Sequence, residues 1–134
     1  MTRTEARENA FILLFEAECR DDETALEIFE YAEQFREFEI NDYVKRVFFG
    51  VFERRKEISE LVDANLVGWN KNRISPVSRA ILALSTFEML ALDDVPAIVS
   101  INEAVELSKK YDDEKTYIFV NGVLNAVANA LEAK

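Results

Sequence analysis

Two arginines near the start of the chain, Arg3 and Arg7, have a recognisable chemical use. They lie four residues apart, so a helix through this segment presents both guanidinium groups from the same side. Two neighbouring cations of this kind can bind an anion. Cations at the N-terminal end of a helix also oppose the helix dipole, and two solvated surface arginines are the alternative explanation. The pattern leaves both an anion site and an ordinary surface open.

Side chains for the common kinds of catalysis are scarce. The chain has one cysteine, Cys19, and no histidine. A single cysteine excludes an internal disulfide, and the lack of histidine removes the usual zinc ligand and the commonest general base. The sequence also has no glycine-rich phosphate loop and no nucleophile elbow. It therefore predicts a protein that is not an enzyme and that uses no metal or other cofactor.

Acidic residues outnumber basic residues by 26 to 16, which gives a net charge of −10. This balance argues against a nucleic-acid partner, because phosphate binding depends on lysine and arginine. The acidic excess is local, however. Residues 21–43 hold nine carboxylates and one arginine, a sum of −8, whereas residues 44–80 hold eight cations and four carboxylates, a sum of +4. The distribution is therefore compatible with a neutral or basic face elsewhere.

These residues depend on helices for their positions. Apolar residues recur at spacings of three and four through most of the chain, and no segment has the pattern of a strand. A capping box of Thr2 and Glu5 opens a first helix at about 3–19. Ser75 and Pro76 supply the strongest start signal. The helix that follows is apolar on more than one side, which is typical of a central helix.

The segment between residues 22 and 66 is expected to hold two helices. A polar cap opens a short acidic helix whose apolar stripe is Leu26, Phe29, Ala32 and Phe35 or Arg36. The second helix then continues without proline for roughly 25 residues to about Leu66. Gly50 in its interior indicates either a close helix contact or a bend.

The C-terminal part is expected to hold two further helices. Ser100 and Glu103 form a second capping box and predict a short helix from that point. The last helix follows a charged loop and continues through Asn121 and Gly122, because the flanking residues have helical spacing. The predicted fold is all-α, a single domain over residues 1–134 with six or seven helices in two small packed bundles, at about 1–68 and 69–134.

The sequence shows no sign of a membrane or export segment. No apolar run approaches the ~20 residues that span a bilayer. The first ten residues also lack the apolar core of a signal peptide. We therefore expect a cytoplasmic protein.

Three stretches carry a distinctive combination of motifs: AREN followed by AFILLFE at 6–16, RISPVSRAILALSTFEML with DVPAIVSINEAVELSKKY at 73–111, and FVNGVLNAV at 119–127. Together they resemble the NusB family of bacterial transcription antitermination factors. The pairing of INEAVELSKKY with FVNGVL at this separation is the specific part. The resemblance implies an all-helical protein of two bundles that catalyses nothing. It also implies binding to the boxA element of ribosomal RNA transcripts jointly with the ribosomal protein NusE, in an RNA polymerase antitermination complex.

The resemblance also implies which residues contact RNA. An arginine-rich N-terminal segment maps onto Arg3 and Arg7, so an Arg7→Glu change is expected to weaken RNA binding without changing the melting temperature. An aromatic residue is common at Phe15, and the last helix motif contributes Lys115, Phe119 and Asn121. Cations suit phosphates, aromatic rings suit stacked bases, and amides suit base edges. Burial in the core is the alternative for Phe15 and Phe119.

The resemblance implies a partner surface that includes the central helix. Arg79 and Glu88 are the charged residues of that helix and are the candidates to face outward. Pairing at a seam between the bundles is the alternative for both. Because Glu5 and Glu8 flank Arg7, we also expect the basic partner NusE to supply part of the positive surface.

The sequence is compatible with two functions and with two oligomeric states. The alternative to an RNA-binding factor is an acidic helical interaction scaffold or homodimer that binds little RNA by itself. The protein is accordingly expected to be a monomer or a homodimer. The NusB-like domain of an RNA cytosine methyltransferase is disfavoured, because no cofactor domain follows residue 134.

Overall fold

The computed structural model describes residues 1–35, 39–66, 68–69 and 74–132. These residues form seven α-helices and no strand, which confirms the predicted all-α fold. The helices are α1 (Arg3–Cys19), α2 (Ala25–Phe35), α3 (Asp42–Glu53), α4 (Arg55–Ala64), α5 (Pro76–Ala91), α6 (Ala97–Tyr111) and α7 (Thr116–Glu132). None of the described helices is long and apolar enough to cross a membrane.

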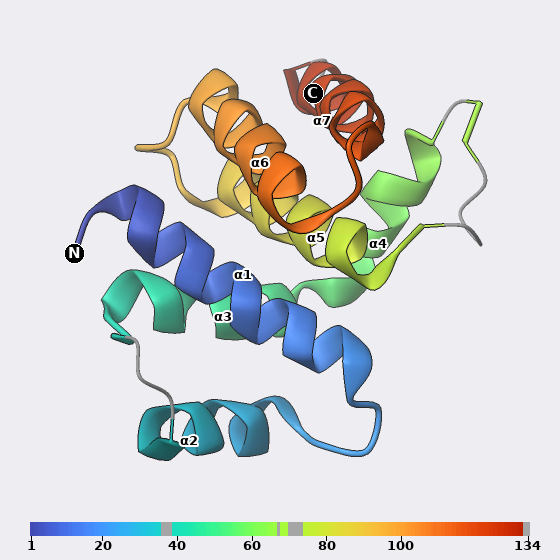
Figure 1. The fold of residues 1–134 in the computed structure, drawn as a ribbon. Coiled ribbons are helices and arrows are strands. Elements are labelled where there is room, and N and C mark those ends of the chain that lie inside the picture. The colour runs from blue at the N-terminus through green and yellow to red at the C-terminus, as the bar shows by residue number, and fades with distance from the viewer. Residues whose placement is uncertain (36–38, 67, 70–73, 133–134) are drawn as a thin grey trace.

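Helix α5 is the centre of the fold. It packs against α1, α3, α4, α6 and α7 (Figure 1). The side chain of Ser75 accepts a hydrogen bond from the backbone N–H of Ser78, and Pro76 occupies the first turn, as expected. Residues on several sides of α5 are buried. The prediction of a central helix is therefore confirmed.

The other helices surround α5 in two groups. Helix α1 lies between α2 and the α5–α6 layer, with α3 packed beside it (Figure 1). Helices α6 and α7 pack closely against each other and against α5. The buried apolar residues of all these helices join in one hydrophobic cluster. One continuous core therefore holds the N-terminal and C-terminal helices together.

Three predicted helix boundaries or faces are wrong. The long helix to residue 66 is interrupted at Arg54, whose φ of −110° and ψ of 21° end α3 and begin α4. The spacing of apolar residues did not predict this break, because the residues before it and after it are both buried at helical intervals. On α2, Leu26 and Phe35 are 56% and 60% exposed, so these two members of the predicted stripe are wrong, whereas Phe29 and Ala32 are buried as expected, together with Ile28.

The third difference concerns the start of α6. This helix begins at Ala97, after Pro96 at the N-cap position, and so Ser100 and Glu103 lie inside it. The fixed φ of proline favours a helix start there. Ser100 is buried and bonded to groups of α5, so its hydroxyl serves tertiary packing instead of a cap.

Gly50 marks a close contact between α3 and α5. A Cβ atom at this position would lie 2.3 Å from Cζ of Phe87, a ring that is only 4% exposed. We expect Gly50→Ala to lower the free energy of unfolding by about 1–2 kcal/mol, because overpacking outweighs the gain in helix propensity. Gly122→Ala is the matched control, since nothing lies within 4 Å of the added carbon. The control should raise the free energy of unfolding by about 0.5 kcal/mol, as measured by urea unfolding. If both variants were more stable than the parent, the close contact between Gly50 and Phe87 would be contradicted.

Candidate functional site

A buried ion pair joins α1 to α5. The capping box of Thr2 and Glu5 starts α1 at Arg3, which places Arg7 one turn into the helix. The guanidinium of Arg7 donates from Nη2 and Nε to Oε2 of Glu88, over 2.9 and 3.0 Å. Arg7 is 2% exposed and Glu88 is fully buried. The paired donors and acceptors give the geometry of a strong charge-assisted contact.

Further polar groups complete this cluster, which we name the Glu88 network. The hydroxyl of Tyr43 in α3 donates to Glu88 Oε2 over 2.9 Å, and Ser100 in α6 donates to Glu88 Oε1 over 2.9 Å. Ser85 and Ser100 share a 2.7 Å hydrogen bond, and Arg7 Nη1 lies 3.2 Å from Glu103 Oε1. The network consists of Arg7, Tyr43, Ser85, Glu88, Ser100 and Glu103. It connects four helices, α1, α3, α5 and α6.

The electrostatics of the Glu88 network favour the charged form of Arg7. Burial by itself lowers the pKa of Arg7, but the hydrogen bond and charge of Glu88 outweigh that cost and leave the pKa raised. Burial, together with the charge of Glu88, raises the pKa of Tyr43 far above its ordinary value, so the phenol stays protonated as a donor. Arg7, Tyr43 and Ser100 thereby satisfy the buried carboxylate, which would be costly if left alone.

Arg3 and Arg7 share one side of α1, as predicted. Both guanidinium groups lie over the ring of Tyr43, at 4.4 and 5.8 Å from its centroid. Arg3 is exposed, whereas the anion bound by Arg7 is a carboxylate of the same chain. A guanidinium that is 2% exposed has no surface left for a phosphate. The expectation that Arg7 contacts RNA is therefore wrong for this conformation.

Glu88 also differs from its predicted position. It was expected to face outward from the central helix, yet it is fully buried. Its burial follows from its position on α5, where α1, α3 and α6 pack over the carboxylate with Arg7, Tyr43 and Ser100. The alternative, pairing at a seam between helices, is the arrangement that the structure has.

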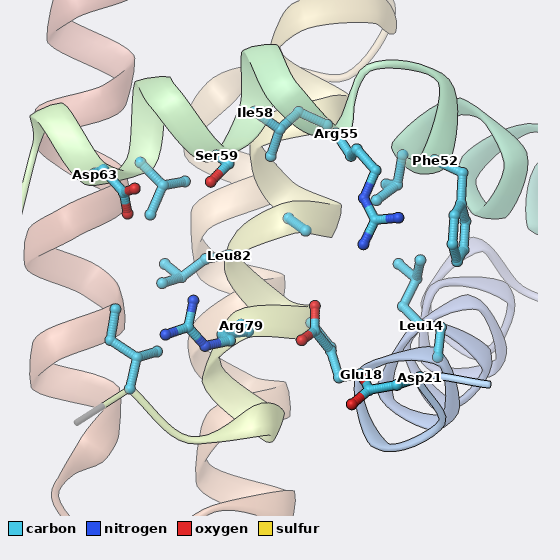
Figure 2. A pocket seen from close by; sticks show the side chains of 16 residues that line it. Leu14, Glu18, Asp21, Phe52, Arg55, Ile58, Ser59, Asp63, Arg79 and Leu82 are labelled. Atoms are coloured by element: carbon cyan, nitrogen blue, oxygen red, sulfur yellow. The ribbon is translucent and has the colours of Figure 1, made fainter. Parts of the chain in front are cut away.

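Arg79, the other partner candidate, is exposed on the rim of a cleft at the start of α5. The cleft has a volume of about 290 Å³ and is lined by residues of α1, α3, α4 and α5. Figure 2 shows the carboxylate of Glu18 in this cleft with Arg55 and Arg79 on its flanks. Burial raises the pKa of Glu18, while the charges of Arg79 and Arg55 oppose that rise. Arg79 thus stands where a partner could reach it.

The residues predicted on the last helix differ in exposure. Lys115 and Asn121 are exposed, at the start and in the second turn of α7. Asn125 donates to the side-chain oxygen of Asn121 over 3.2 Å, which orients the Asn121 amide. Phe119 is only 9% exposed, in agreement with the core alternative. Phe15 on α1 is half-buried against the core and stacks on Phe11 at 6.2 Å between ring centroids.

A second cavity lies between the start of α5 and the start of α7. Its volume is about 640 Å³, and we name it the Trp69 pocket. The indole of Trp69 meets Phe119 edge to face, with ring centroids 4.8 Å apart. Lys115 and Phe119 both line the pocket, so the structure brings these two predicted residues together.

Arg3 is not part of that group. Its guanidinium stacks on Tyr43 of α3, beside the N-terminus. In Figure 1 the N-terminus lies at the left edge of the molecule, whereas α7 begins right of centre. The predicted cluster of cations and amides from both ends of the chain therefore separates into an N-terminal and a C-terminal surface.

The sequence analysis missed two features of these surfaces. Tyr43 and Ser100 have no spacing that links them to Arg7 or Glu88, because the link exists only after four helices pack. The available signal was the charge of Glu88 in the apolar C-terminal half of the central helix. Trp69 is the single tryptophan of the chain, and the presence of this one large aromatic residue in a polar connector was a signal that could have been used.

The fold and these surfaces define an all-helical interaction protein. The polar groups of the Glu88 network bind one another in the interior, and the two surfaces carry exposed cations, amides and aromatic rings. The NusB family matches residues 4–129 of the chain. The chain belongs to the NusB family, which is a family of transcription factors and not of enzymes.

Individual relatives agree with this assignment. The transcription antitermination protein NusB of Clostridium perfringens is 41% identical over 131 residues, which cover 95% of this chain and 96% of the relative. A solved structure of T. maritima NusB is 35% identical, has a TM-score of 0.83, and aligns over 96% of this chain and 92% of its own. A solved structure of the antitermination factors NusB and NusE in complex with double-stranded RNA includes a chain that is 29% identical. That chain has a TM-score of 0.81 and aligns over 96% of both chains.

Proposed function

We propose that the protein is a transcription antitermination factor that binds boxA-type RNA of ribosomal RNA transcripts jointly with the ribosomal protein NusE. It would act in the cytoplasm, within an RNA polymerase antitermination complex. The observation that carries the proposal is family membership over nearly the whole chain, together with the shared fold of a NusB that has been solved with NusE and RNA.

The charges of the molecule fit joint binding better than binding alone. The net charge of −10 repels a polyanion, and the internal pairing of Arg7 removes one more cation from the surface. A basic partner on the acidic protein would reverse the local field and bring its own phosphate contacts. We propose as contacts of this chain to RNA Arg3 on the N-terminal surface and Lys115 and Asn121 on the C-terminal surface, together with Phe15, whose ring is half-buried on α1.

The partner surface is proposed at the cleft that contains Arg79. Its rim combines two arginines with the carboxylates of Glu18 and Asp21, a mixed pattern that can select a partner by charge. The apolar residues of its floor, such as Leu14 and Leu82, give the cleft an apolar area to cover. Contact with Glu88 is not part of this proposal, because that side chain is buried.

Titration of labelled boxA RNA with and without NusE at two salt concentrations tests the function. We expect tight RNA binding only when the protein and NusE are both present. The affinity should fall as the salt concentration rises, and the slope of log affinity against log salt gives the number of phosphates that the pair contacts. Absence of RNA binding by the pair at low salt would reject the proposal. Light scattering and protein–RNA crosslinking would then identify the alternative, an acidic scaffold or homodimer.

Lys115 provides a separate prediction about RNA affinity. Lys115→Glu should weaken RNA binding by the pair about tenfold and reduce the salt slope by about one phosphate, because it replaces a cation with a carboxylate. Fluorescence anisotropy of the labelled RNA measures both quantities. Lys56→Glu is the matched control, since Lys56 is an exposed lysine on α4. Equal effects of the two reversals would show that only the overall charge matters.

A further inference from the structure

Trp69 offers an exposed aromatic ring beside the predicted RNA surface. The side chain is 48% exposed, and it borders the Trp69 pocket together with Ile118, which is 55% exposed. Phe119, the aromatic that the family resemblance assigns to RNA, is 9% exposed and lies in edge-to-face contact with the indole. Of the two rings in this contact, that of Trp69 is therefore the one exposed for stacking.

The polar groups of the pocket distinguish it from a purely apolar groove. The hydroxyls of Ser75 and Ser78 both donate to Oδ2 of Asp112, over 2.9 and 3.1 Å. These two bonds hold the carboxylate in place, and a carboxylate has about four acceptor sites, so it can accept further hydrogen bonds. An apolar peptide side chain would leave these acceptors without a donor, which is unfavourable.

The cation of the pocket lies at its rim. Lys115 is exposed there, and its backbone N–H donates to Asp113 Oδ1 over 3.2 Å, which fixes the turn before α7. The pocket thus combines an aromatic face, an apolar wall, a cation and two carboxylates, those of Asp112 and Asp113, of which Asp112 is held by the two serine hydroxyls. A nucleotide supplies the complement of each: a flat base, an exocyclic amino group and a phosphate.

We propose that the Trp69 pocket binds one unpaired base of single-stranded RNA, stacked on the indole of Trp69, with its exocyclic amino group directed to Asp112 and its phosphate to Lys115. This inference rests on the proposed function and adds a specific subsite to it. Adenine, cytosine and guanine each carry an exocyclic amino group that can donate to Asp112, whereas uracil carries only exocyclic carbonyl groups. The pocket should therefore prefer a base with an amino group, such as adenine or cytosine, to uracil.

Trp69 is the only tryptophan in the chain, so its fluorescence reports on this pocket alone. Titration of the protein with AMP, CMP and UMP, corrected for absorbance with free N-acetyltryptophanamide, measures the subsite without the partner. We expect saturable quenching, with binding of AMP or CMP at least about fivefold tighter than binding of UMP. Absence of saturable quenching by all three nucleotides would overturn the inference, and equal quenching by UMP would overturn the role of Asp112.

The second arm measures affinity for a boxA RNA 12-mer in the presence of NusE by anisotropy. Trp69→Ala should weaken binding by at least about fivefold, the lower range for loss of one stacked base, whereas Trp69→Phe should retain most of the affinity. Phe35→Ala, at a 60% exposed ring on α2, is the control for any exposed aromatic. Circular dichroism and thermal melting confirm that each variant is folded.

The outcomes separate the inference from the proposed function. If the pair binds RNA and Trp69→Ala has no effect, the subsite is rejected and the proposed function stands. If the pair binds no RNA, the proposed function fails, and the mononucleotide titration alone decides whether the pocket binds a base. Crosslinking of the RNA to NusE only, with unchanged Trp69 fluorescence, would also reject the subsite.

Discussion

Replacement of Arg7 by alanine is expected to lower the free energy of unfolding by about 3–5 kcal/mol, because it leaves Glu88 as an uncompensated buried charge. Both residues are at most 2% exposed, and three hydrogen bonds join their side chains. The melting temperature should fall by about 10–20 °C for a chain of this length. Urea unfolding and thermal melting by circular dichroism measure the two quantities.

Two controls separate the buried pair from a general effect of arginine. Arg3→Ala removes an exposed arginine one turn earlier and should cost at most about 1 kcal/mol, the value of a surface cation contact. The double variant Arg7→Met with Glu88→Leu removes both charges and should recover much of the stability. An Arg7→Ala protein as stable as the parent would contradict the geometry. The structure therefore reverses the sequence-based expectation that a change at Arg7 leaves melting unaffected.

Phe48→Ala should have a similarly large effect, a loss of about 3–5 kcal/mol, because it opens a cavity in the core. Phe48 is fully buried, and its ring lies 6.0 Å from Phe29, 5.3 Å from Phe49 and 5.1 Å from Phe52 between centroids. Helix α2 packs mainly on α1, and Phe29 is its aromatic link to α3. Chemical denaturation measures the loss of stability.

Hydrogen exchange adds a local readout for the same variant. Protection of α2 amides should fall more than protection of α7 amides, since α2 loses one of its few packing partners. Phe35→Ala is the matched control, because that ring on α2 is 60% exposed and its removal should change stability by less than about 0.5 kcal/mol. Uniform loss of protection in both helices would show that α2 is not held by the aromatic contact.

Local signals predicted the helices well where capping chemistry was explicit. Thr2 with Glu5, and Ser75 with Pro76, fix helix starts through groups within one turn of each other, and the structure has both starts. The sequence did not predict the break at Arg54 or the early helix start at Ala97, because neither interrupts the regular spacing of apolar residues. Boundaries of this kind depend on the packing of the helices and not on local sequence.

The site was less predictable than the fold for the same reason. The sequence marks Arg7 and Glu88 as charged residues in unusual positions, but it leaves open whether Glu88 faces a partner or pairs at a seam, and it does not connect Glu88 with Arg7. Their separation of 81 residues hides the pairing from any local pattern. Phe119 was difficult to predict for a different reason. Helical spacing indicates that its ring lies near the core, but it does not indicate whether a neighbour such as Trp69 covers the ring. Exposure is a property of the assembled helices.

The sequence separation within the Glu88 network has a consequence for synthesis on the ribosome. At about 5–20 residues per second, a growing chain carries Arg7 without its carboxylate for roughly 4–16 s. Ser85 and Ser100, two of the three hydroxyl-bearing residues of the same network, are also made late. A nascent N-terminal half therefore lacks the carboxylates of Glu88 and Glu103 that pair with Arg7 in the folded chain. The first helix to be translated can complete its buried contacts only after α5 and α6 have been made.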